Sequence, residues 1–212
     1  MHRLKGKVAI ITGGVSGFEE ATTRLFVRLG ANVIIADVQD EKSGALCNDI
    51  ASGTDYSDSS SISYAHCNVT DDTSVKNVVD LAISKYGKLD IMFNNASISG
   101  DLDKTTLGTA NENFKKVFDV NVYGAFLGAK HAARVMIPRK SRVILLTVSL
   151  ASVVCGETSH AYTMSKHAIM GLMKNLCVEM GQYGIRVKAI SPCAVSTLIL
   201  THSLGIDKAT LG

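Results

Sequence analysis

The feature of this sequence that most constrains its fold is the alternation of short apolar segments with longer helical patterns. The first apolar segment, Lys7 to Thr12, shows no polar alternation, which is typical of a parallel strand buried on both faces. It ends in a glycine-rich turn at residues 13–17, and a helical pattern follows as far as Leu29, with Gly30 as its cap. This order predicts an α/β fold, a doubly wound parallel sheet with helices on both faces.

The same alternation continues along the chain, without an internal repeat or a break in composition. We therefore expect a single domain over residues 1–212. The remaining expected strands cover residues 32–37, 62–67, 89–93, 142–147 and 185–190, and the remaining expected helices cover about 40–51, 71–86, 112–137 and 159–183.

Composition excludes several classes of function. Hydrophobic residues make up 46% and charged residues 19%, as in a globular domain, and the formal net charge is only +3. Lysine and arginine are scattered along the sequence, so we expect no nucleic acid and no membrane partner. The five cysteines form no C-x-x-C pair, which favours reduced thiols, a cytoplasmic location and no metal site.

A pyrophosphate-binding site is predicted where the first strand, its glycine turn and the following helix meet. Glycines let the backbone approach the anion, and the N–H groups at the helix start point toward it. Asp37, at the end of the second strand, can accept hydrogen bonds from a ribose diol and would repel a 2′-phosphate. These features favour a Rossmann-like fold that binds NAD rather than NADP.

Tyr162 and Lys166 form the candidate reactive pair. Their i, i+4 spacing places both side chains on one helix face, where the ammonium stabilises the ionised form of the phenol. A tyrosine and a lysine at this spacing also occur together on ordinary helix surfaces, so this pair alone is weak evidence.

Several separate motifs, in order, resemble those of the short-chain dehydrogenase/reductase family. The glycine turn, Thr12 to Glu19, resembles T-G-x-x-x-G-x-G, and Asn94 to Ser97 resembles N-N-A-G. Pro192 to Thr197 resembles P-G-x-V-x-T, and Ser149 precedes the Y-x-x-x-K motif by the family's usual thirteen residues. Three short sequence segments, at residues 35–41, 130–134 and 183–187, resemble those of a plant group of the family. This group includes secoisolariciresinol, borneol and xanthoxin dehydrogenases.

The resemblance implies an NAD-dependent oxidoreductase that interconverts a hydrophobic cyclic secondary alcohol and its ketone. It implies that Tyr162 is the general acid and base, that Lys166 assists it, that Ser149 binds the substrate oxygen and that Asn121 supports a water. Ser152 competes with Ser149, and the spacing favours Ser149; Asn121 could instead only bridge backbone groups. The implied NAD-binding residues are Gly13, Ser16, Gly17, Phe18, Asp37, Val38, Asn68, Val69, Asn95, Ala96, Tyr162, Lys166, Val195 and Thr197.

The chain also departs from the family pattern. Glu19 replaces the third glycine and adds negative charge near the anion site, Ser97 and Cys193 replace two other glycines, and Asn68 stands where aspartate is usual. The family continues into a further helix and a seventh strand and forms dimers or tetramers, so we expect six strands here, a chain short at its C-terminus and a homo-oligomer. The departures leave open an alternative function, in which a catalytically weak or silent homologue acts as a binding or interaction protein.

Overall fold

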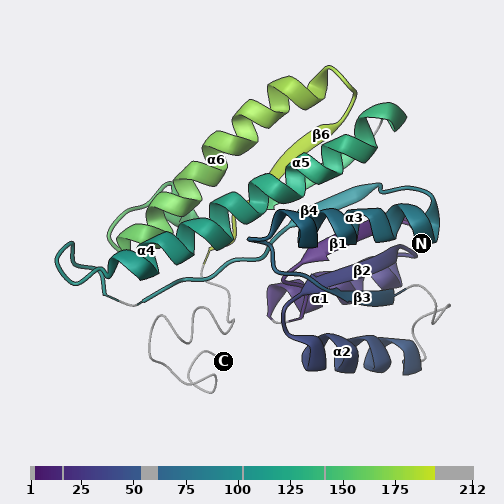
Figure 1. The fold of residues 1–212 in the computed structure, drawn as a ribbon, viewed down its shortest axis with the longest axis horizontal. Helices are drawn as coiled ribbons and strands as arrows, with labels where there is room; N and C mark the ends of the chain where they lie inside the picture. Colours follow the sequence, from purple (N-terminus) through teal and green to yellow (C-terminus); the bar gives the residue numbers. More distant parts are fainter. Residues whose placement is uncertain (1–2, 16, 54–61, 102, 141, 194–212) are drawn as a thin grey trace.

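The computed structural model describes residues 3–15, 17–53, 62–101, 103–140 and 142–193, and within these ranges it does not describe the side chain of Glu19. The described residues form one sheet of six parallel strands in the order β3-β2-β1-β4-β5-β6 (Figure 1). The sequence prediction of a Rossmann-like, doubly wound parallel sheet is confirmed. The strands are β1 (Val8–Thr12), β2 (Asn32–Asp37), β3 (Ile62–His66), β4 (Ile91–Asn94), β5 (Val143–Thr147) and β6 (Arg186–Ile190).

Helices cover both faces of this sheet. α3 (Asp72–Tyr86), α5 (Gly124–Met136) and α6 (His160–Gly181) pack on one face, whereas α1 (Phe18–Arg28) and α2 (Asp40–Ser52) pack on the other. The chain moves outward from β1 through β2 to β3, and then returns to the other side of β1 to place β4. The order of the sheet therefore reverses between β1 and β4, where proteins of this architecture bind their ligands.

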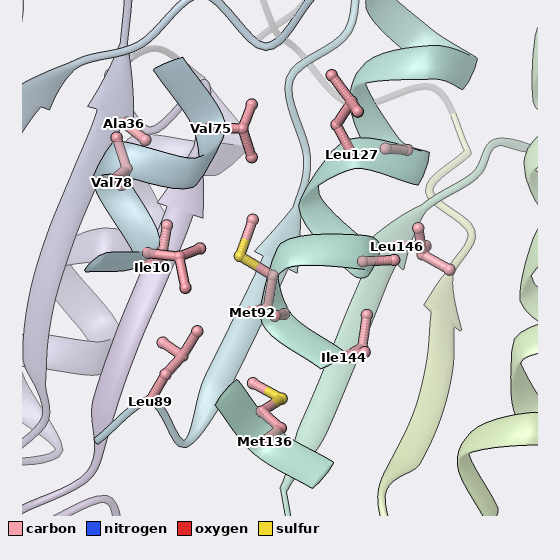
Figure 2. Packing of buried hydrophobic residues seen from close by; sticks show 14 of the residues in the cluster. Ile10, Ala36, Val75, Val78, Leu89, Met92, Leu127, Met136, Ile144 and Leu146 are labelled. Atoms are coloured by element: carbon pink, nitrogen blue, oxygen red, sulfur yellow. The ribbon is translucent and has the colours of Figure 1, made fainter. Parts of the chain in front are cut away.

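Each central strand contributes to two separate cores. In β1, Val8 and Ile10 face the cluster under α3 and α5, whereas Ala9 and Ile11 face the cluster under α1 and α2. Figure 2 shows the first cluster, in which Ile10 and Met92 from the strands pack with helical residues such as Val75 and Leu127. Burial on both faces explains why this strand is a continuous apolar run.

The expected long helix at 112–137 is divided in the structure. α4 (Asn111–Phe118) leads into a π-helical turn, η2 (Asp119–Tyr123), and then into α5. The expected end of this stretch at residue 137 agrees with the end of α5 at Met136, and Pro138 lies in the 3-10 turn η3 (Ile137–Arg139) that follows. A proline is tolerated at the start of a helical turn because its missing N–H would have no partner there.

Candidate active site

The candidate residues converge at the carboxyl ends of the strands. The glycine turn follows β1, Asp37 ends β2, and the segment Asn94–Ala96 lies at and after the end of β4. Ser149 follows β5 and begins a short 3-10 turn, η4 (Leu150–Ser152), which packs against α6. Because all six strands are parallel, these segments meet at one edge of the sheet.

The glycine turn has the conformation that its sequence predicts. Gly13 has φ +69°, and a Cβ at this position would lie 2.9 Å from the Cα of Ala96, so the two backbones touch. Gly17, with φ 59°, occupies the N-cap of α1 and supplies no side-chain acceptor to its first N–H groups. Phe18 is the first residue of α1 and is half-buried, whereas Ser16 lies outside the described residues. The helix start can therefore face an anion with backbone donors.

The carboxylate of Asp37 is buried but keeps one oxygen available. Its Oδ1 accepts hydrogen bonds from the backbone N–H of Gln39 at 3.0 Å and from the Gln39 side chain at 3.4 Å. Among the described residues nothing donates to its Oδ2. The neighbouring Val38 is 55% exposed, so an apolar surface lies beside this carboxylate.

Asn68 and Val69 differ in their availability to a ligand. Asn68 is exposed, and its Oδ1 accepts hydrogen bonds from the backbone and the hydroxyl of Thr70 at 3.1 and 2.9 Å. Val69 is buried, and a Cβ at Gly124 would come within 2.8 Å of its side chain. Asn68 therefore offers an accessible amide, while Val69 also serves the contact between β3 and the start of α5.

A chain of hydrogen bonds links the glycine turn to Lys166. Thr12 Oγ1 accepts from the backbone N–H groups of Asn95 and Ala96 at 2.9 and 3.1 Å. Thr147 Oγ1 donates to Asn95 Oδ1 at 2.6 Å, and the carbonyl oxygen of Thr147 accepts from Lys166 Nζ at 3.1 Å. The last residue of β1, the end of β4, the last residue of β5 and the lysine of α6 are thus held together directly.

Lys166 and Tyr162 lie side by side on α6, as their spacing predicts. Lys166 is only 1% exposed, and its Nζ lies 5.3 Å from the centroid of the Tyr162 ring. Ser159 caps the helix by accepting the backbone N–H of Tyr162 at 3.4 Å. A buried ammonium next to an aromatic ring is not a solvated helix face, so this geometry disfavours the surface interpretation of the pair.

Asn121 acts as a bridge through its side chain. Its Oδ1 accepts the backbone N–H of Ile98 at 2.9 Å, and its Nδ2 donates to the Ile98 carbonyl and to Ser165 Oγ, both at 3.0 Å. The residue is buried in the π-helical turn η2, a form of helix that occurs often at functional sites. The Asn121 side chain therefore bridges the backbone of Ile98 and the hydroxyl of Ser165, as one of the two interpretations of this residue expected. Its role in supporting a water remains a prediction.

The two candidate serines have different surroundings. Ser149 is half-buried, and its Oγ accepts the backbone N–H of Ala151 at 3.2 Å, which leaves its hydroxyl proton for another acceptor. Ser152 is buried, and its Oγ donates to the Ser149 carbonyl at 2.7 Å. The hydroxyl of Ser152 is thus used inside the turn, which favours Ser149 as the serine that meets a substrate.

Sequence reasoning missed the residues that connect the site. Thr12 lies inside the recognised glycine motif, but no role was expected for its side chain. Thr147 and Ser165 were not expected either; Ser165 lies three residues after Tyr162, so their shared helix face was a usable signal. Burial is the property that reveals Ser165, because it is fully enclosed between Asn121 and the Tyr162 carbonyl, to which it donates at 2.7 Å.

Other expectations fall partly beyond the described residues. Val195 and Thr197, within residues 194–212, lie outside them, and so does the side chain of Glu19. Ser97 is described, and its Oγ is buried without a hydrogen-bond partner among the described residues. Cys193 is exposed. Cys67 is buried, which raises the pKa of its thiol to about 11 and makes that thiol unreactive.

The described residues contain no group of three or more histidine, cysteine, aspartate or glutamate side chains that could hold a metal ion. In the same residues, no helix is both long and apolar enough to cross a bilayer.

Known proteins match nearly all of this chain. A family model described as enoyl-(acyl carrier protein) reductase matches residues 13–210. A short chain aldehyde dehydrogenase 1 from Euphorbia lathyris is 54% identical over 98% of this chain and 70% of its own length. A secoisolariciresinol dehydrogenase from Forsythia intermedia is 50% identical over 97% and 72%, and a borneol dehydrogenase from Lavandula x intermedia is 48% identical over 93% and 72%.

Solved structures agree with these relatives. Levodione reductase superposes with a TM-score of 0.89 at 30% identity, over 95% of this chain and 77% of that one. A 3-ketoacyl-(acyl-carrier-protein) reductase from Brucella melitensis, solved with NADH, gives a TM-score of 0.84 at 28% identity, over 94% and 80%. These similarities and the geometry of the site confirm the resemblance first seen in the motifs, including the likeness to plant dehydrogenases. The chain belongs to the short-chain dehydrogenase/reductase family of oxidoreductases.

Proposed function

We propose that this protein is an NAD-dependent oxidoreductase that interconverts a hydrophobic cyclic secondary alcohol and its ketone. The observation that carries this proposal is the hydrogen-bonded chain from Thr12 through Asn95 and Thr147 to Lys166. It joins the glycine turn, which suits a pyrophosphate, to the lysine beside Tyr162. The segments proposed to hold the cofactor and the residues proposed to move the proton are therefore joined by direct hydrogen bonds.

The described residues fit a nicotinamide dinucleotide. The uncapped start of α1 and the close approach of Gly13 to Ala96 suit a pyrophosphate beside bare backbone. Asp37 Oδ2 is positioned to accept a ribose hydroxyl, and a 2′-phosphate there would meet a buried carboxylate. This carboxylate supports NAD over NADP.

The chemistry of this chain's own residues is proton transfer. A nicotinamide held by these residues would supply the hydride acceptor for oxidation of the alcohol carbon and the hydride donor for reduction of the ketone. Tyr162 takes the hydroxyl proton of the alcohol in the first direction and gives it back to the ketone in the other. The ammonium of Lys166 favours the ionised phenol, and the Ser149 hydroxyl donates to the substrate oxygen as negative charge develops there.

Apolar side chains near the site support a hydrophobic substrate. Leu150, Val153 and Val154 follow Ser149 in the chain and are 41%, 72% and 45% exposed, and Met164, two residues after Tyr162 on α6, is 51% exposed. Exposed apolar side chains in the segment that follows a candidate catalytic serine suit a ligand that shields them from water. The relatives named for secoisolariciresinol and borneol point to the same kind of substrate.

Titration with NAD tests the proposal first. We expect saturable binding by calorimetry or protein fluorescence, and much weaker binding of NADP. A panel of cyclic terpenoid, lignan and steroid alcohols, followed by NADH absorbance, then tests turnover. Saturable NAD binding with NADH formation from at least one of these alcohols is the expected result, whereas absence of NAD binding at millimolar concentration overturns it.

A second candidate function is a catalytically weak homologue that binds ligands or partners. It is favoured by Glu19, which adds negative charge beside the anion site, and by Ser97, whose buried hydroxyl lacks a partner among the described residues. Weak or absent NAD binding that becomes tight in the Glu19→Gly variant would identify this alternative. Unchanged affinity in the variant would show that Glu19 does not impair the site.

A further inference from the structure

The fold gathers cations that are far apart in the sequence into one row at the amino ends of the strands. Lys7 precedes β1, Lys88 lies shortly before β4, Arg142 precedes β5 and Arg186 begins β6. Hydrogen bonds between the backbones make these strand starts neighbours: Asp90 donates to Val8, Val143 to Asp90 and Arg186 to Arg142. The row, which we call the basic edge, also includes Lys5 and Lys140. It lies at the opposite end of the strands from the candidate active site (Figure 1).

The cations of the basic edge outnumber the acids that form ion pairs with them within the described residues. Asp90 is shared by Lys7, Lys88 and Arg142 at 4.0, 3.3 and 3.2 Å, so one buried carboxylate faces three cations. Lys5, Lys140 and Arg186 are exposed and form no ion pair with the described residues. One acid of the last turn of α6, Glu179, is also exposed.

Helix dipoles account for part of the pattern. Helices of this sheet end at the same edge, and cations in their last turns, such as Arg28 and Lys85, offset the partial negative charge there. The members of the basic edge lie outside those helices, in the segments that lead into the strands. Each brings a full charge, whereas a helix terminus carries only about half an opposite charge.

The backbone conformation of Lys140 is a second observation that points to a functional role for the basic edge. Lys140 is the only described residue other than glycine with a positive φ, 51°. A lysine gains nothing from this conformation, which glycine or asparagine adopts more easily. The backbone therefore holds a cation outward at a strained position between η3 and β5, and such strain occurs most often at functional sites.

We propose that the basic edge docks the protein on the surface of an anionic phospholipid bilayer, without insertion, although the scattered lysines and arginines of the sequence predicted no membrane partner. Two exposed apolar side chains favour lipid over nucleic acid: Val178, in the last turn of α6, and Tyr183, in the segment between α6 and Arg186, are 74% and 37% exposed. Lysine and arginine beside such residues suit a headgroup layer, where their charges meet phosphates and the apolar groups meet the interface. Docking at this edge leaves the opposite, candidate active edge facing away from the surface.

Flotation with lipid vesicles tests the proposal. We expect the full chain to float with vesicles of phosphatidylcholine containing about 30% phosphatidylserine in about 0.1 M salt, and not with phosphatidylcholine alone. The triple variant Lys5→Gln, Lys140→Gln, Arg186→Gln should lose at least about tenfold in partitioning. The matched control Lys104→Gln, Lys115→Gln, Lys116→Gln removes the same charge from exposed positions in and before α4 and should bind like the wild type.

Three outcomes would overturn the proposal. The first is no binding of the wild type to the anionic vesicles, and the second is an equal loss in both triple variants, which would indicate net charge alone. The third is displacement from the vesicles by duplex DNA at equal phosphate concentration, which would assign the edge to nucleic acid. If the edge variant does not fold, judged by circular dichroism, the single variant Arg186→Gln against Lys115→Gln makes the same comparison.

Discussion

At the scale of single residues, Tyr162 is the group on which the proposed reaction depends. Its ring lies beside the buried ammonium of Lys166, and phenylalanine would keep that contact while removing the hydroxyl. Tyr162→Phe should therefore lower kcat by about 10²–10⁴-fold, the usual contribution of an acid/base group, with NAD affinity and melting temperature little changed. Stopped-flow and steady-state assays on the wild-type substrate check this. Retained turnover would exclude Tyr162 as the acid/base.

The two serines after β5 give a matched pair of substitutions. Ser149→Ala removes a donor to the substrate oxygen and should lower kcat by about 10²-fold or more. Ser152→Ala removes only the hydrogen bond to the Ser149 carbonyl and should cost about 1 kcal/mol of stability with a small effect on kcat. Comparing kcat and urea unfolding for both variants separates the roles, and a larger kcat loss in the Ser152 variant would reverse the assignment.

Residue types and spacing predicted much of this site, but not its connections. Tyr162 and Lys166 share a helix, so their contact follows from local geometry. Thr12 and Thr147 come from strands that are separated by over a hundred residues, and their hydrogen bonds depend on strand order and register. The sequence pattern gives neither of these, and this is why the two threonines were missed.

At the scale of elements, Thr12 joins the end of β1 to the end of β4. Its hydroxyl accepts two backbone N–H groups, those of Asn95 and Ala96, in a region where Thr12 and Asn95 are buried. Thr12→Val keeps the shape but leaves these donors without an acceptor, which should destabilise the protein by about 2–4 kcal/mol. Thr12→Ser, which keeps the hydroxyl, should retain most of the stability. Urea unfolding at fixed pH measures both, and equal stability of the two variants would contradict this role.

The contact between α3 and α5 should make stability depend on acid pH. Lys130 and His131 hold the pKa of Asp72 below its ordinary value, and Lys76 and Arg134 do the same for Asp80. A carboxyl group whose pKa is lower in the folded state stabilises the fold at pH values above its unfolded pKa. That contribution is lost as the pH falls through the folded pKa.

Melting temperature measured from pH 7 down to about pH 3 tests this contact. We expect the wild type to lose stability over the acid end of the range, and Asp72→Asn with Asp80→Asn to show a shallower decline. Both carboxylates are largely exposed, so the effect should also shrink in high salt. Parallel curves for the two proteins would show that this contact does not contribute.

The boundaries of helices and strands could be predicted where a local sequence signal marks them. They could not be predicted where tertiary packing determines the backbone conformation. The start of α6 follows from the Ser159 cap, and the expected β strands agree with the structure to within two residues at either end. The division of the 112–137 helix by the π-helical turn was not predicted. Asn121 lies in that turn and reaches the backbone of Ile98, a segment that is distant in the sequence, so local periodicity carries no sign of it.

At the scale of the whole molecule, alternation predicted a parallel sheet, but the motifs alone do not say which side of β1 each later strand joins. The reversal between β1 and β4 places β4 beside β1 and β5 beside β4. Their starting segments then meet at Asp90. This carboxylate is 4% exposed, and its Oδ2 accepts the backbone N–H of Val8 at 2.9 Å while three cations surround it.

Asp90 should therefore hold the central strands together more than its place outside the active site suggests. Asp90→Ala leaves the Val8 N–H without its acceptor and removes the carboxylate that three cations share, and we expect a loss of about 3 kcal/mol. Asp90→Asn keeps an acceptor and should cost about half as much. Lys88→Gln removes one partly exposed partner and should cost under about 1 kcal/mol. Urea unfolding of the three variants gives this order directly. If Lys88→Gln lowered the free energy of unfolding as much as Asp90→Ala, the contribution of Asp90 would come from its ion pair and not from its buried hydrogen bond to Val8. The stability of the protein would then decrease as the salt concentration rises.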